Sequence, residues 1–236
     1  MSAWGSKTMV APIWGHFDES GEDRANGKLK RLTLGGFFAP WPEIKALCER
    51  WREALETEGL GSFHMKEIAS NEHDYENWPS DRQVRLKRFV DILCDHASHF
   101  GAYSKEAVGA KNLFVRAYQP CLNRAFIELE NICIDGGARG NIVFAQSAEI
   151  SNAMIGRYFD LANWSGWFDG YGVRKSSNEP ALQAAEIVAR GMKQLMQDGT
   201  ITYSFARILA TGKPIRFWPP APAAALLVPL RFGSRK

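Results

Sequence analysis

Two adjacent carboxylates stand at the end of an apolar segment near the start of the chain. Asp18 and Glu19 follow the run VAPIWGHF, and a Ser-Gly dipeptide comes directly after them. The apolar run predicts a buried strand over residues 9–17, with the two acids where it ends in a glycine turn. Carboxylates delivered at a strand end can bind a divalent metal ion, although strands also end in polar turns that have no function.

Three further acids lie in settings that could bring them to the same place. Glu67 lies in FHMKEI, Glu149 follows the apolar run NIVFA, and Glu186 lies in the first turns of a late helix. Mg²⁺ and Mn²⁺ prefer several oxygen ligands, which two-metal nucleases supply from converging carboxylates. Asp18, Glu149 and Glu186 are therefore the candidate metal ligands. Glu67 is the candidate that completes the cage or orients water.

Glu186 also has an interpretation without any site. The polar stripe of its helix is Glu186, Arg190, Lys193 and Gln197, at spacings of four, three and four. On a solvated face, Glu186 and Arg190 would form an ordinary pair worth about 0.3–0.5 kcal/mol. Periodicity alone leaves this interpretation and the metal-site interpretation open.

Three other polar residues are candidate substrate-binding groups. His64 and Lys66 flank Met65, so an alternating pattern places both on the side opposite Met65, where they could contact phosphate. His64 could also bind metal, shuttle protons, or simply pack beside Phe63. Ser20 follows the first two acids. It is not in a GxSxG context, which argues against a serine nucleophile.

The elements that must position these residues alternate along the chain after an initial hairpin. Turn signals and hydrophobic periodicity predict a mixed sheet with helices packed on it, an α/β fold. The expected strands are 9–17, 29–40, 99–107, 140–147 and an edge strand near Val173, with 62–69 as a strand or turn. The expected helices are 42–58, 80–96, 110–134 with a break at Pro120, 151–163, and 179–198 closed by Gly199.

The totals indicate one domain with tails. The chain has 236 residues, of which 45% are hydrophobic, enough for one large core. We expect a flexible segment at 1–8, a single domain at 9–204, and a Pro/Ala-rich basic extension at 205–236. All 26 acidic residues precede residue 199, whereas six basic residues follow it. Such an extension could hold a polyanion near an acidic site, or it could be a solvated tail.

Several protein classes are excluded by composition. No apolar run approaches the ~20 residues that span a bilayer, so no membrane partner is expected. The first residues lack the apolar core of a signal peptide. The four cysteines form no CxxC pair, which argues against a zinc knuckle and favours reduced thiols in the cytoplasm.

Four segments together resemble a known family. These are FDESG at 17–21, FHMKEI at 63–68 within SFHMKEIA, the strand NIVFA, and the late segment PALQAAEIVA. Their order and distances resemble those of the bacterial and phage family called domain of unknown function 3800, from about residue 10 to 197. Members begin with a strand that ends in an Asp-Glu-Ser-Gly motif and close with a helix that carries Leu-Gln-x-Ala-Asp.

The resemblance implies a ribonuclease H-like fold with a nuclease-type metal site. It places Asp18 at the first-strand aspartate, with Glu19 beside it, and Glu186 where the late-helix aspartate stands in the family. Near the end of the strand at 142–146, where such a site has an acid, this chain has Gln146, and the nearest acid is Glu149.

The sequence therefore predicts a metal-dependent nuclease that hydrolyses phosphodiesters with Mg²⁺ or Mn²⁺. The metal would lower the pKa of a bound water and neutralise charge in the transition state. Nucleic acid is the expected partner. The alternative is a non-catalytic regulatory protein on the same scaffold, of phage or mobile-element origin, that binds nucleic acid or protein. The departures at residues 146 and 186 favour this alternative.

Overall fold

The computed structural model describes residues 10–23, 29–70, 81–106, 117–147, 152–162 and 166–218. Its first two strands, β1 (Ile13–Asp23) and β2 (Leu29–Pro40), form the predicted antiparallel hairpin. The predicted end of β1 at residue 17 is wrong, because β1 stays paired with β2 as far as Asp23. The expected segment 1–8 lies outside the described residues.

The described strands form one mixed sheet in the order β5-β4-β1-β2-β3-β6. β2 is antiparallel to β1 and to β3 (His99–Glu106), whereas β4 (Gly140–Ala145) is parallel to β1. β5 (Phe168–Arg174) and β6 (Ile215–Trp218) are the edge strands, each parallel to its neighbour. The fold is therefore α/β, as predicted, and it is consistent with a ribonuclease H-like fold.

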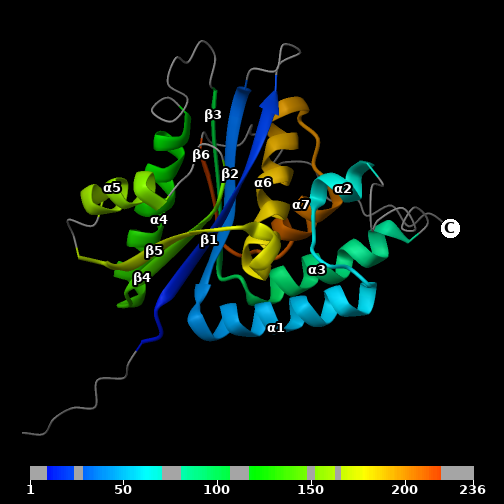
Figure 1. Cartoon of the computed structure of the whole chain (residues 1–236), viewed down its shortest axis with the longest axis horizontal. Helices are drawn as coiled ribbons and strands as arrows, with labels where there is room; N and C mark the ends of the chain where they lie inside the picture. Colours follow the sequence, from blue (N-terminus) through cyan, green and yellow to red (C-terminus); the bar gives the residue numbers. More distant parts are fainter. Residues whose placement is uncertain are drawn as a thin grey trace, which may run out of the picture.

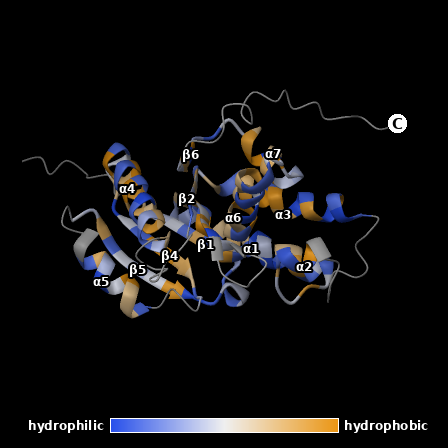
Figure 2. Cartoon of the chain, turned by 90° about the horizontal axis from the view of Figure 1, so that it is seen from above, coloured by the Kyte–Doolittle hydropathy of each residue, from blue (hydrophilic) through white to orange (hydrophobic). Residues whose placement is uncertain are grey.

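Helices cover the two faces of this sheet as separate layers (Figures 1 and 2). One layer holds α4 (Gln119–Gly136) and α5 (Asn152–Ala162). The other holds α1 (Trp41–Glu58), α3 (Arg82–His96), α6 (Pro180–Asp198) and α7 (Tyr203–Leu209). Each layer has its own apolar core, with Phe17, Phe126 and Phe144 in the first and Trp51, Phe89 and Met192 in the second.

The segment FHMKEI is a short helix. The structure corrects the expected strand or turn at 62–69 to α2 (Met65–Ser70), which begins directly after His64. The His64 carbonyl accepts the Ile68 amide at 3.1 Å, the first hydrogen bond of a helical turn. Met65 and Ile68 are buried in the core shared with α1 and α6, so α2 is fixed by its apolar side. Six residues are too few for helical periodicity to be visible in the sequence.

The fold continues past residue 204, where the sequence analysis ended the domain. Phe205 and Ile208 of α7 are fully buried, and β6 pairs with β3 from Ile215 to Trp218. Of the expected extension, residues 219–236 lie outside the described residues. The part that is described belongs to the packed domain.

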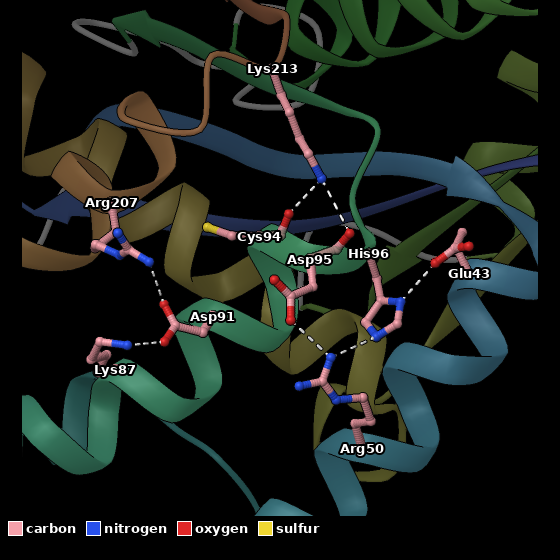
Figure 3. Close-up of polar contacts among 9 residues, drawn as sticks. All are labelled: Glu43, Arg50, Lys87, Asp91, Cys94, Asp95, His96, Arg207 and Lys213. Carbon is pink, nitrogen blue, oxygen red and sulfur yellow. Dashed lines mark hydrogen bonds and ion pairs between the residues drawn. The ribbon is translucent and has the colours of Figure 1, made fainter.

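The basic residues of this described part contact the protein itself, as Figure 3 shows for Arg207 and Lys213. Arg207 donates to the Asp91 carboxylate at 2.8 Å, and Arg216 lies 3.4 Å from Glu128. The Lys213 ammonium donates to the carbonyls of Cys94, Asp95 and Ala97 at the end of α3. Carbonyls at a helix C-terminus carry partial negative charge, so a lysine there stabilises the helix end. These three bases therefore have structural roles.

Within the described residues, none of the helices combines the length and the apolar character that a membrane span needs. The four cysteines are free thiols, and all four are buried.

Candidate functional site

Asp18 lies on β1 just past the residue where the parallel pairing of β1 with β4 ends. β4 pairs with β1 up to the Phe17–Phe144 pair, whereas β2 continues past it and places Gly35 opposite Asp18. Side chains alternate along a strand, and Phe17 packs toward α4 and α5. Asp18 therefore points to the opposite face, toward α6. A position just beyond the carboxyl end of a parallel strand, at a change of strand direction, is a common ligand site in α/β proteins.

Glu186 reaches Asp18 because α6 lies unusually close to the sheet. A Cβ placed on Gly35 would come within 2.3 Å of the Ala189 backbone, so only a glycine allows this approach. Glu186 precedes Ala189 by about one helical turn and is largely covered, with 16% of its side chain exposed. The structure thus turns Glu186 toward the sheet.

The environment of Asp18 strongly favours the protonated form of its carboxyl group. Asp18 is 9% exposed and its Oδ1 accepts the Glu19 amide at 2.7 Å. Burial, with the negative charge of Glu186 as the next largest cause, raises the pKa of Asp18 to about 8. Two carboxylates that share a buried place cannot both ionise unless a proton or a cation joins them.

His64 also lies close to Glu186. Its Nδ1 is 3.7 Å from Glu186 Oε2, which is ion-pair distance. The Glu186 side chain raises the pKa of His64 most; burial opposes this effect, and the charges of Glu67 and Asp18 raise it further. Asp18, His64, Glu67 and Glu186 therefore form one electrostatic cluster, built from β1, α2 and α6. An ion pair of Glu186 with Arg190 is not seen among the described residues.

The remaining predicted residues have different positions. Glu67 is half-buried on α2, whereas Lys66 on the same helix is exposed. Ser20 is half-buried on β1, two residues beyond Asp18 and on the same face. Glu149 lies outside the described residues. Gln146 is exposed directly after β4, and its amide donates to the Arg174 carbonyl at 2.7 Å.

Gln183, which was not among the candidate residues from the sequence, joins several segments around the site. Its Oε1 accepts from Trp51 Nε1 and from the Phe63 amide, both at 3.0 Å. Its Nε2 donates to the carbonyls of Ser176 and Ser177. The side chain, in a residue that is 1% exposed, thus uses its full capacity to join α6 to α1 and to the backbone beside His64. The sequence signal for Gln183 was its position in PALQ, within one of the segments that carry the family resemblance.

Two more residues near Asp18 were missed. His16, two residues earlier on the same face, is 2% exposed and lies with its ring stacked near Phe37. Burial, with the positive charge of Arg174 as the second cause, lowers the pKa of His16 to about 3, which favours the neutral imidazole. Arg174 ends β5, paired with Ala145. No sequence motif contained it.

The donor set around Asp18 fits a hard divalent cation. Asp18 and Glu186 offer carboxylate oxygens in a largely buried place, and the charge of Glu186 is the second cause that raises the pKa of Asp18, so a cation there would stabilise the ionised carboxylates. Within the described part of the chain, no three His, Cys, Asp or Glu residues form a complete metal site. Mg²⁺ does not need one, because it commonly binds through one or two carboxylates and retains water or phosphate ligands.

Comparison with known proteins adds no relative: no protein-family model matches the sequence, and no curated protein matches it.

Proposed function

We propose that the protein is a metal-dependent phosphodiesterase that acts on nucleic acid. The observation that carries the proposal is the buried Asp18 carboxyl group beside Glu186, with a pKa raised to about 8. Such a pair is costly for a fold unless a cation joins it, and Mg²⁺ or Mn²⁺ is the cation that carboxylate oxygens favour. The resemblance of FDESG and PALQAAEIVA to the domain of unknown function 3800 family supports the same assignment.

Each residue of the cluster has a role in this chemistry. Asp18 and Glu186 would hold the cation, which lowers the pKa of a bound water and offsets charge on the phosphate when it is bound. Glu186 raises the pKa of His64 and so favours the protonated imidazole, which can donate a hydrogen bond or a proton to a phosphate oxygen. The charge of Glu67 helps to raise the pKa of His64, and Glu67 would orient water. Lys66, exposed on α2, is placed to contact the backbone of the substrate.

The test is a cleavage assay with labelled DNA and RNA in Mg²⁺ or Mn²⁺. We expect Asp18→Asn and Glu186→Gln to abolish cleavage while the circular dichroism spectrum stays unchanged. Asp160→Asn is the matched control, because Asp160 is exposed on α5, on the other face of the sheet. Wild-type activity in Asp18→Asn would refute the assignment.

A non-catalytic binding protein is the second candidate. It is favoured by Gln146, which is exposed after β4 where a nuclease-type site has an acid, and by the ion pair that already engages Glu186 with His64. This candidate predicts nucleic-acid or protein binding that EDTA does not change, with no cleavage in either metal.

We also propose a cytoplasmic location, because all four cysteines are unpaired thiols.

A further inference from the structure

Arg174 lies in the same row of the sheet as Asp18. Phe17, Phe144 and Val173 are paired across β1, β4 and β5, so the next row holds Asp18, Ala145 and Arg174. All three positions face the side of α6, since Ala145 packs with Leu182 of that helix. Two strand spacings, about 10 Å, separate the backbones of Asp18 and Arg174. The small side chain of Ala145 is the only one in the row between them.

The Arg174 side chain turns back along its strand. A Cβ built on Gly172 would lie 3.7 Å from Arg174 Nε, so the side chain passes over Gly172. Arg174 is exposed and makes no ion pair with any other described residue. A guanidinium that lies beside a carboxylate site, and that is not itself paired with a carboxylate, is suited to bind phosphate.

An aromatic pair lies on the same face, four rows earlier. Trp14 packs on Val143, Ala145 and Leu182, and its ring centroid is 4.7 Å from that of Trp41. Trp41, the first residue of α1, is 40% exposed. Four rows along the strands are about 13 Å, in addition to the lateral distance of about 10 Å between β1 and β5. A single strand a few nucleotides long could therefore contact both Trp41 and Arg174.

We infer that this surface takes single-stranded nucleic acid, with a base stacked on Trp41 and a phosphate on Arg174. The inference rests on the proposed function, since it names the substrate class of the same site. An exposed indole can stack only on a base that is out of a duplex, and this stacking tolerates any base. A duplex would present its phosphates to Arg174 but leave Trp41 without a partner.

The test measures binding without cleavage. Fluorescence anisotropy in EDTA compares two labelled probes. One is a single-stranded oligothymidylate, and the other is a hairpin duplex of the same length. We expect the single strand to bind more tightly, and Trp41→Ala to weaken its binding about tenfold, as loss of one stacked base does. Arg174→Gln should weaken binding and reduce the salt slope by about 0.7, the effect of one phosphate contact on a single strand.

Matched controls separate these effects from a general loss of charge or apolar surface. Val84→Ala removes a residue that is 72% exposed on α3, and Arg157→Gln removes an exposed arginine on α5, on the opposite face. Both should bind as the wild type does. Preference for the duplex, no binding of the single strand, or wild-type binding by both Trp41→Ala and Arg174→Gln would overturn the inference.

The two proposals can fail separately. If the single strand binds through Trp41 and Arg174 but is not cleaved in Mn²⁺, the surface stands and the nuclease assignment falls. If cleavage depends on Asp18 but is unchanged in both surface variants, the nuclease assignment stands and the surface assignment falls.

Discussion

The backbone of Ala189 lies directly on Gly35, so closely that a Cβ on Gly35 would be 2.3 Å from the Ala189 nitrogen. Gly35 is paired with Asp18 across the hairpin, and Glu186 is one helical turn before Ala189. The absence of one side chain in β2 therefore sets how near the helix carboxylate comes to the strand carboxylate.

Gly35→Ala should separate the two carboxyl groups. The new methyl group forces α6 away from the sheet, at a cost of about 1–3 kcal/mol in the free energy of unfolding, because backbone atoms cannot make room as a flexible side chain can. Metal binding should weaken at the same time. Urea unfolding and calorimetry measure the two effects. Gly61→Ala is the control, since a Cβ there meets nothing within 4 Å, and an equal loss in that variant would contradict the account.

Gln183→Leu should destabilise the fold and loosen the site. It keeps the size of the side chain but leaves the donors Trp51 Nε1 and the Phe63 amide without an acceptor in a buried place. Each unsatisfied donor costs about 1–3 kcal/mol, so we expect a loss of about 2–5 kcal/mol. Gln197→Leu, at an exposed position of the same helix, should change stability little. Equal unfolding midpoints in urea for the two variants would show that Gln183 does not hold the segment of His64.

Asp18→Asn should stabilise the metal-free protein at high pH. The Asp18 carboxyl group ionises near 3.8 in the unfolded chain and at about 8 in the folded one. Between these values the unfolded chain has lost the proton and the folded protein retains it, so the free energy of unfolding falls as pH rises. Above about 8 this group causes no further loss. The asparagine variant avoids the penalty.

The measurement is urea unfolding in EDTA at pH 5 and at pH 9. We expect the variant to gain about 2–5 kcal/mol over the wild type between the two values, since each unit of pKa shift corresponds to about 1.4 kcal/mol. His64 is present in both proteins, so the comparison removes most of its contribution to the pH dependence of stability. Asp18 is the smallest of the causes that raise the pKa of His64, so its removal changes this contribution little. A difference that does not change with pH would mean that Asp18 is ionised without cost.

Local patterns were sufficient for much of the fold. The hairpin and α6 were predicted because apolar runs, turn residues and a closing glycine all agreed, and Gly199 does adopt the left-handed conformation, with φ of 75°. The end of β1 was missed because an acidic segment can remain in a strand that is paired on one side only. α2 was missed because its six residues show no period.

Parts of the candidate site depend on contacts distant in sequence. Asp18 and Glu186 were found from residue type and from a resemblance, but the effect of Glu186 on the pKa of Asp18 needs the approach of Ala189 to Gly35. The role of Gln183 depends on partners 120 and 132 residues away. Arg174 shares a row with Asp18 only because β4 lies between β1 and β5, and a strand order of this kind is not written in local periodicity.

The most direct test of the account is calorimetric titration of Mn²⁺ into the wild type, Asp18→Asn and the control Asp160→Asn. The account predicts binding to the wild type and to the control, release of a proton from Asp18 below pH 8, and loss of binding in Asp18→Asn. Absence of binding to the wild type up to millimolar Mn²⁺, with and without an oligonucleotide, would contradict it. So would equal affinity in Asp18→Asn.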